Sequence, residues 1–414
     1  MKKGEGNSSP RINVRVSLPK PEMRSVFLKD MAYKKARVVL TIISVACLVM
    51  LILLMGGMMN ALTMQAKDYV NSVDKQAKTG VVWLSTERSG STFAGFSLLD
   101  SEYLEVLKIA KGVDKDIPLS PLIFAQARPI IKGKEKKAIV VGYKLGRLGG
   151  PSEQDLKDPT SPFYPITGRL FQPSEYEGPE YIPPAEVVVD EKTGLEIGQT
   201  VELSGKPLKV VGKTKGHLFV FDTPLLFVDL RTAQNTVLSN VLYVNTMLVK
   251  AEEGYNESTL AGEIKNLSPI RVDAHTGNQI VKIILANYVD EPMKGVRALR
   301  ALLWIATGLI VAMITYMTTL EKTREIGVLK AIGASDKYVI SMILKQVLLT
   351  TLAGVVLGIL LAVVSARFFP IMVSISLREP LIVAIITIAV CSYGGYVAAK
   401  RAASVDPMIA FRGR

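Results

Sequence analysis

The sequence predicts an α-helical membrane protein with four transmembrane helices and an α+β domain inserted between the first and the second of them. Two observations carry this prediction. Four stretches without a charged side chain are each long enough to cross the hydrocarbon core of a bilayer as a helix, which takes about 20 residues. They cover residues 38–66, 301–320, 346–366 and 380–399. The first two stretches are separated by more than half of the chain. In that long segment the apolar residues recur at the spacings of strands and of helices.

The distribution of charge indicates which parts face the cytoplasm. The chain has 50 Lys and Arg residues against 37 Asp and Glu. Residues 67–300 contain 29 of each kind. Three short segments, 1–37, 321–345 and 400–414, together hold 19 basic and 7 acidic residues. Because short flanks rich in Lys and Arg stay in the cytoplasm while long domains are translocated regardless of charge, both termini and 321–345 are expected to be cytoplasmic. The long segment and the short loop 367–379 are then external.

Several functional classes are disfavoured by what the sequence lacks. The basic surplus adjoins membrane spans, which argues against a nucleic-acid partner. Cys47 and Cys391 both lie in predicted spans, so the external segment has no disulfide or cysteine metal site. No P-loop, catalytic triad or metal-binding motif occurs, so we predict no catalytic residue, metal site or cofactor site on this chain. The spans contain no ionisable residue, which argues against an ion-coupled transporter.

The external segment is predicted to be a discontinuous α+β domain. Residues 81–144 are expected to alternate strands and one helix, and 241–274 to add further strands and a helix to the same lobe. A β-rich lobe at about 150–240 would be inserted between them. The proline-dense stretch 150–184 is predicted to be an irregular connection, because proline continues neither a helix nor a central strand. Ser204–Pro207 is predicted to form the turn of a hairpin.

Small residues in the last two spans indicate close helix packing. Gly354 and Gly358 form a GxxxG pattern, which lets two helix backbones approach each other. Gly394 and Gly395 give the fourth span a similar small face. An isolated GxxxG is also compatible with glycines placed by chance in an apolar helix, so the pattern alone does not identify the partner helix.

The segment 321–334, between the second and third spans, is predicted to be a short cytoplasmic helix. Its apolar residues recur at helical spacing, and Glu321, Arg324 and Glu325 are spaced for pairing within a helix. Gly333 is expected to end the helix. Such a helix, held between two spans, could transmit force. A solvated connector would have the same pattern, and physical arguments alone leave both readings open.

Three motifs, in order along the chain, resemble those of one family. The first comprises Glu321, Thr323, Arg324, Glu325, Ile326, Gly327, Ala331, Ile332, Gly333 and Ala334. The second comprises Gly168–Phe171, Glu186–Asp190, Gly194–Leu195, Ile197–Val201 and Val210–Gly212, and the third is the tail Arg401–Pro407. These are similar to the cytoplasmic coupling segment, the extracytoplasmic core domain and the terminal motif of MacB/FtsX-type permeases, also called type VII ABC transporters.

The resemblance implies a multi-pass, non-catalytic permease subunit in the inner (cytoplasmic) membrane of a prokaryote. In this family ATP and Mg are bound by a separate ABC ATPase, which docks on the segment matching 321–334, and the permease is a homodimer or pseudo-dimer. Closure of the ATPase dimer would move the external domains, a process called mechanotransmission, to export or extract an amphiphilic, lipid-like or peptide substrate. The stand-alone four-span layout looks most like DevC-like and MacB-like subunits.

One alternative remains within the family. An FtsX-like regulatory subunit would activate an extracytoplasmic partner, such as a cell-wall hydrolase, without moving a substrate. FtsX-type proteins usually have a smaller external domain than this chain, and the 414 residues do not include an ATPase domain like the N-terminal one of MacB. An extracytoplasmic adaptor or substrate protein is a further candidate partner. A membrane-anchored adhesion protein without energy coupling is disfavoured by the coupling motif.

Overall fold

The computed structural model describes residues 35–93, 96–100, 103–117, 119–173, 185–267, 271–369 and 372–403. The chain divides into two compact units, which we call the membrane unit (1–51, 303–361 and 382–414) and the external unit (52–302 and 362–381). The predicted basic N-terminal segment up to residue 34, and the part of the terminal motif beyond Ala403, lie outside the described residues.

Four helices in the described part of the chain are long and apolar enough to cross a membrane, which confirms the predicted four spans. They are α2 (Lys35–Ala77), α6 (Glu291–Glu321), α8 (Asp336–Ala366) and α9 (Arg378–Ala403). Helix α6 continues without a break from α5 (Gly277–Ile284) through the π-helical turn η4 (Leu285–Asp290). Pro292 is the second residue after this turn, and because proline has no N–H to donate, the regular hydrogen-bond pattern is interrupted there.

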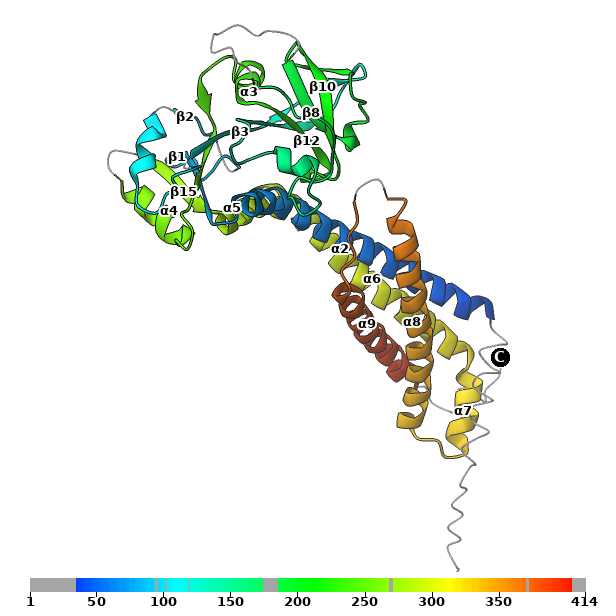
Figure 1. Cartoon of the computed structure of the whole chain (residues 1–414). Helices are drawn as coiled ribbons and strands as arrows, with labels where there is room; N and C mark the ends of the chain where they lie inside the picture. Colours follow the sequence, from blue (N-terminus) through cyan, green and yellow to red (C-terminus); the bar gives the residue numbers. More distant parts are fainter. Residues whose placement is uncertain are drawn as a thin grey trace, which may run out of the picture. The chain divides into compact units, whose positions relative to one another are not determined.

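The external unit is built on one mixed sheet with the strand order β15-β1-β14-β3-β6-β12-β8-β10-β9-β4-β5 (Figure 1). The strands are β1 (Val81–Thr86), β3 (Leu119–Ala127), β4 (Ile130–Ile131), β5 (Lys134–Glu135), β6 (Ala138–Tyr143), β8 (Ala185–Asp190), β9 (Thr200–Leu203), β10 (Lys206–Thr214), β12 (Thr223–Asp229), β14 (Thr246–Lys250) and β15 (Val272–Thr276). Two short strands, β7 (Ile166–Gly168) and β11 (Leu218–Phe219), pair with β10 and β12. A separate pair joins β2 (Leu99–Asp100) to β13 (Tyr243–Val244).

The single sheet differs from the separate inserted lobe that the sequence predicted at about 150–240. Strand β6 pairs in parallel with β12, with Ile139 opposite Leu225, and so joins the two halves. All six residues of β6 are buried, and the apolar run of β12 is buried from its second residue onward. Strands buried on both faces belong at the centre of a sheet, so the sheet does not end between the predicted lobes.

Helices cover both faces of the sheet. One apolar core lies under α3 (Leu230–Val237), α4 (Glu257–Asn266) and the 3-10 helix η1 (Tyr103–Ile109). The one helix predicted within 81–144 corresponds to η1, whereas α3 lies in the segment predicted to be β-rich and was not predicted. Asp229 caps α3 by accepting a hydrogen bond from the Arg231 N–H at 3.0 Å, a local signal of a helix start that the sequence analysis did not use. The opposite core lies under α2 and α5.

The described part of the proline-dense connection contributes to this second core. Phe163 and Phe171 are buried in it, so the connection packs through its aromatic residues. Its residues 174–184 lie outside the described part of the chain. The predicted hairpin is formed by β9 and β10. Ser204 and Gly205 both have positive φ angles, of 52° and 75°, as in the type I′ turn, whose twist matches that of the two paired strands.

Candidate functional site

The predicted coupling segment forms a separate helix, α7 (Thr323–Ala331), after a break at Lys322. Gly333, at a φ of 105°, ends this helix. Its N–H donates to the Lys330 carbonyl at 2.9 Å, and the Ala334 N–H donates to the Leu329 carbonyl at 2.9 Å. This pair of hydrogen bonds is the Schellman arrangement, which needs a left-handed residue and therefore favours glycine. The helix thus ends where the sequence predicted.

The charged residues of the segment are arranged differently from the predicted intrahelical pairs. Glu321 pairs with Arg37 of α2 at 2.7 Å. The break at Lys322 takes Glu321 out of helical register with Arg324 and Glu325, which are exposed at the start of α7. Thr323 bonds through its hydroxyl to the Leu320 carbonyl at 2.5 Å and so fixes the break.

One side of the segment is apolar and exposed. Ile326 and Gly327 are buried, whereas Val328 is 41% and Ile332 76% exposed. These two residues are four positions apart and therefore lie on one helical face. Ala331 and Gly333 are also exposed. We call Val328, Ala331, Ile332 and Gly333 the coupling face, with Ala334 half-buried beside it.

The glycines of the GxxxG pattern lie where α8 meets α2. A Cβ atom at Gly358 would be 2.8 Å from the Ala46 carbonyl oxygen and 2.8 Å from the Val49 Cβ. A Cβ atom at Gly354 would be 2.8 Å from the Val45 Cβ. All three distances are shorter than a carbon atom tolerates, so the two backbones approach this closely only because the positions are glycine.

The glycines of the fourth span also contact helices of the same chain. A Cβ atom at Gly394 would be 2.7 Å from the Gly308 carbonyl oxygen of α6. One at Gly395 would be 3.0 Å from the Val347 side chain of α8. All four predicted packing glycines therefore serve contacts inside one subunit. Contact with a second copy would have to use other residues.

The sequence analysis predicted a loop at 367–379 but not that residues 372–379, the end of this loop and the start of α9, lie along α2 within the external unit. We call residues 372–379 the strap. The Ser374 N–H donates to the Gly57 carbonyl of α2 at 2.9 Å. A Cβ atom at Gly57 would be 2.5 Å from Val373, so glycine is needed for the strap to approach this closely. The adjacent glycines of the first span, Gly56 and Gly57, were the available signal.

The end of the strap is fixed by a charged side chain. Glu379 accepts a hydrogen bond from Asn60 of α2 at 2.7 Å and pairs with Arg300 of α6 at 3.1 Å. A Cβ atom at Gly56 would be 1.6 Å from the Glu379 carboxylate. Both charged side chains are largely buried, so each depends on the other for compensation of its charge.

The other end of the strap is attached to the sheet through Asp222. Its carboxylate accepts hydrogen bonds from Gln65 of α2 at 2.5 Å, from the Lys192 ammonium at 3.1 Å and from the Met372 N–H at 3.2 Å. Burial acts to raise the pKa of this carboxyl, but the bonds from Gln65 and Lys192 outweigh burial and lower it. Phe221 and Asp222 both have positive φ angles, 62° and 56°, which orient the turn.

Replacing Asp222 by alanine is expected to loosen the strap. Hydrogen bonds to a charged group contribute about 1.5–3 kcal/mol, so exchange of the Met372 amide should become roughly 10- to 100-fold faster. Hydrogen–deuterium exchange measures this directly, with the exposed Asp116→Ala as control. Because the folded pKa of Asp222 lies below its ordinary value, the attachment should persist at neutral pH and fail only as the pH falls through that lowered pKa. Unchanged exchange at Met372 would contradict the attachment.

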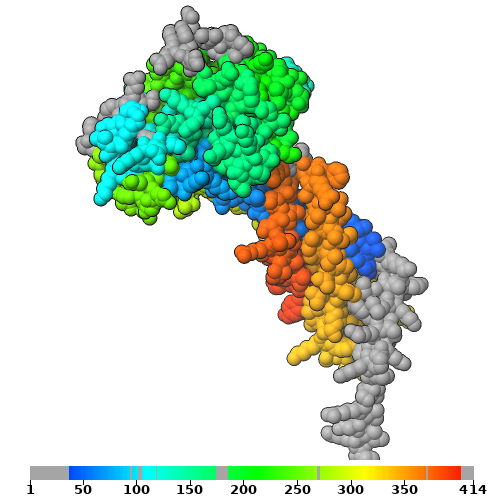
Figure 2. Space-filling view, viewed as in Figure 1, coloured from blue at the N-terminus to red at the C-terminus, as the bar shows by residue number. Residues whose placement is uncertain are grey.

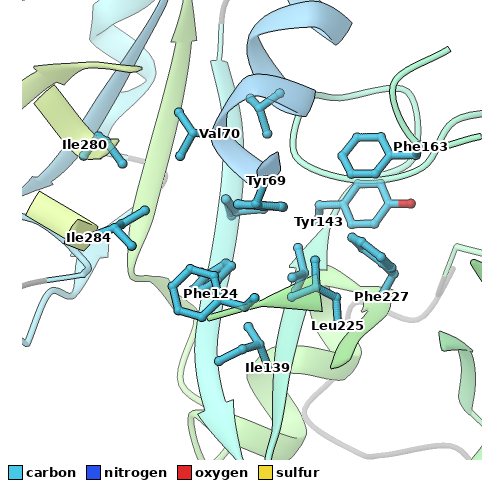
Figure 3. Packing of buried hydrophobic residues seen from close by; sticks show 14 of the residues in the cluster. Tyr69, Val70, Phe124, Ile139, Tyr143, Phe163, Leu225, Phe227, Ile280 and Ile284 are labelled. Atoms are coloured by element: carbon cyan, nitrogen blue, oxygen red, sulfur yellow. The ribbon is translucent and has the colours of Figure 1, made fainter. Parts of the chain in front are cut away.

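The C-terminal part of α2, which we call the stalk and which includes Tyr69 and Gln76, is fixed to the external unit by polar and aromatic contacts. The Tyr69 hydroxyl donates to the Gly149 carbonyl at 2.8 Å, and Gln76 donates to the Gly150 carbonyl at 2.9 Å. The ring of Tyr69 lies 5.0 Å from that of Phe124. Figure 3 shows Tyr69 and Val70 beside sheet residues such as Phe124, with Ile280 and Ile284 in the same core. The stalk and α5 therefore move together with the sheet.

Comparison with known families covers nearly the whole chain. The MacB-like periplasmic core domain matches residues 38–267, more than half of the chain, and the FtsX-like permease C-terminal domain matches 298–407. The chain is a MacB/FtsX-type ABC transporter permease. The second match includes the coupling segment and the third and fourth spans.

Individual relatives and one solved structure are similar to parts or most of this chain. An uncharacterized ABC transporter permease of Mycobacterium tuberculosis strain H37Rv is 24% identical over 394 residues, which cover 93% of this chain and 98% of the relative. A putative hemin transport system permease of Staphylococcus haemolyticus is 27% identical over 153 residues, covering 36% of this permease and 42% of the relative. The solved periplasmic region of MacB from Actinobacillus actinomycetemcomitans aligns with a TM-score of 0.34 and 16% identity, covering 49% of this chain and 92% of that one.

The described residues of the permease contain no group of three or more His, Cys, Asp or Glu side chains that could hold a metal ion. The structure instead brings together packing arrangements. They are the exposed coupling face, the glycine contacts between spans, the strap and the stalk contacts on the sheet.

Proposed function

We propose that this permease transmits movement from a separate ABC ATPase to its external domain. The observation that carries the proposal is the continuity of one helical path. Helix α7 presents the exposed coupling face next to α6, and α6 continues through η4 into α5, which is packed on the sheet. A displacement of α7 would pass along this path as a shift between two packed arrangements.

The ATPase is proposed to bind ATP and Mg and to dock on 321–334. A partner surface that buries Val328 and Ile332 would remove two exposed apolar side chains from water, which favours association. We further propose a functional unit with two permease copies. One chain offers one coupling helix, and an ATPase that works by closing two subunits needs two such helices, as closed twofold symmetry provides.

The proposed substrate is an amphiphilic molecule, lipid-like or peptide, that is exported or extracted. The predicted spans carry no ionisable side chain to line a polar path, which favours work done on the external side. Two relatives are a probable syringafactin export protein and a putative hemin transport permease, which supports an amphiphilic cargo by analogy.

An FtsX-like regulatory role is the second candidate, and one observation favours it. Phe96, Ile109 and Leu242 of the external unit are 81%, 85% and 60% exposed. A contiguous apolar patch on an external domain binds protein partners, and these three side chains are the candidates to form one. Capture of a hydrolase whose activity depends on the permease, with no change in transport of any amphiphile, would favour this role.

The proposed function is tested by purifying the complex from native membranes through a tag on the permease. We expect an ABC ATPase to copurify in equal amounts, with two copies of each subunit by native mass spectrometry. The permease alone should hydrolyse no ATP. Recovery of the permease without any nucleotide-binding subunit would overturn the proposal, and a one-to-one complex would overturn the dimer.

The proposed topology is tested by cysteine labelling in a background with Cys47→Ser and Cys391→Ser. Lys157→Cys should react with a membrane-impermeant maleimide in intact cells, because its segment is external. Val328→Cys should react only after the membrane is permeabilised, because the basic flanks are cytoplasmic. Both side chains are exposed, so burial does not limit the reaction. The opposite labelling pattern would invert the topology.

A further inference from the structure

An apolar groove of about 470 Å³ lies between α8 and α9 in the membrane unit. Its lining includes Lys337, Ile340, Leu344, Lys345 and Leu348 of α8, together with Tyr396 of α9. In Figure 2 the yellow-to-orange surface of α8 adjoins the red-orange surface of α9. None of the glycine contacts, the strap or the coupling face uses this groove.

The shape of the groove follows from the packing of the two helices. Gly395 of α9 contacts Val347 of α8, where a Cβ atom would be 3.0 Å away. The groove adjoins this contact, because Leu348 and Tyr396 directly follow these two residues in the sequence. Leu344 lies one turn before Leu348 on the same helical face, so the apolar side chains form a continuous stripe along α8.

The charge of the groove is entirely positive. Lys337 and Lys345 are exposed and eight residues apart, a rise of about 12 Å along α8. The residues that line the groove include no Asp or Glu. The neighbouring carboxylate of Asp336 pairs with Lys330 at 2.7 Å and is therefore already engaged. The groove thus offers two lysine ammonium groups to an anion.

The start of α8 and the end of α9 are expected to lie at the depth of the lipid headgroups. Helix α9 ends with Lys400 and Arg401 in its last turn, and the predicted third span begins just after Lys345. Basic pockets between transmembrane helices on the cytoplasmic side are suited to the headgroups of anionic lipids. The apolar stripe runs beside the two lysines and reaches Leu348 in the predicted third span, where the first part of an acyl chain would lie.

We propose that this groove binds an anionic phospholipid of the cytoplasmic leaflet. The lipid phosphate would lie between Lys337 and Lys345, and an acyl chain would run along Ile340, Leu344 and Leu348. The choice of leaflet rests on the proposed topology. A lipid held there would brace the first turns of α8, which directly follow the coupling segment.

Native mass spectrometry of the permease tests this with phosphatidylglycerol and phosphatidylcholine of identical acyl chains. We expect preferential retention of phosphatidylglycerol by the wild type. The double variant Lys337→Gln/Lys345→Gln should retain at least about tenfold less of it. The matched control Lys132→Gln/Lys134→Gln removes two exposed lysines of the external unit and should behave as the wild type.

A second variant separates a built site from general attraction to charge. Leu344→Trp fills the groove and keeps both lysines, so it should also lower phosphatidylglycerol retention. Equal retention of both lipids by the wild type, or full retention by Leu344→Trp, would overturn the proposal. Displacement of the lipid by millimolar inorganic phosphate would point to a free-phosphate site instead. Copurification of the ATPase is measured on the same samples, so loss of the lipid site and failure of the proposed function remain distinguishable.

Discussion

Replacement of Ile332 by aspartate is expected to release the ATPase from the permease. Ile332 is the most exposed apolar side chain of the coupling face, at 76% exposure. Docking of the ATPase would bury the Ile332 side chain. An aspartate carboxylate at this position would then be buried without a counter-ion, which costs free energy of binding. Central residues of such interfaces cost about 2 kcal/mol or more when replaced, which corresponds to roughly 30-fold weaker binding.

The measurement is the amount of ATPase that copurifies with each tagged permease. The control is Ile109→Asp, which places the same charge at an isoleucine of the external unit that is 85% exposed. That variant should recover the ATPase in full. Because both side chains are exposed in the isolated chain, neither change should alter the melting temperature. Undiminished ATPase recovery with Ile332→Asp would remove the coupling face from the proposed interface.

Replacement of Gly358 by leucine should prevent stable packing of the spans. A Cβ atom there would already be 2.8 Å from the Ala46 carbonyl oxygen, and a backbone atom of a long helix cannot turn aside as a side chain can. Extra carbon atoms in a packed interior cost about 1–3 kcal/mol even where side chains can adjust, so we expect at least about 3 kcal/mol here. Helices α2 and α8 would have to separate.

The expected readout is a lower melting temperature in detergent and loss of the monodisperse peak in size-exclusion chromatography. Ala353→Leu is the matched control, because Ala353 lies on the exposed side of the same helix. It adds a similar side chain without meeting α2. If Gly358→Leu were as stable as this control, the close α2–α8 approach would not contribute to the fold.

Local chemistry allowed the sequence to predict much of this permease. Hydropathy is a sum over neighbouring residues, and the four spans follow from it without knowledge of their partners. The end of α7 at Gly333 is also local, because a left-handed residue is required within the turn itself. The coupling motif lies in one continuous stretch, so its resemblance to the family could be read directly.

The sequence did not predict contacts between distant segments. The strap joins Asp222, Gln65 and Met372, which are far apart in the sequence and share no periodic pattern. The prediction of a separate lobe at about 150–240 likewise depended on element order, whereas the parallel pairing of β6 with β12 makes one sheet. Strand pairing between remote segments depends on which apolar faces meet, and that is decided only when the whole core forms.

The sequence by itself determined that this is a four-span permease with an external α+β domain and with a helix between its second and third spans that ends at a glycine. Those properties arise from the composition and order of adjacent residues. Only the tertiary structure decided that Gly354 and Gly358 contact α2 of their own chain, and that the strap is fixed to both α2 and the sheet. A glycine pattern specifies that a backbone can approach closely, but the identity of the approaching backbone depends on how all the helices are packed.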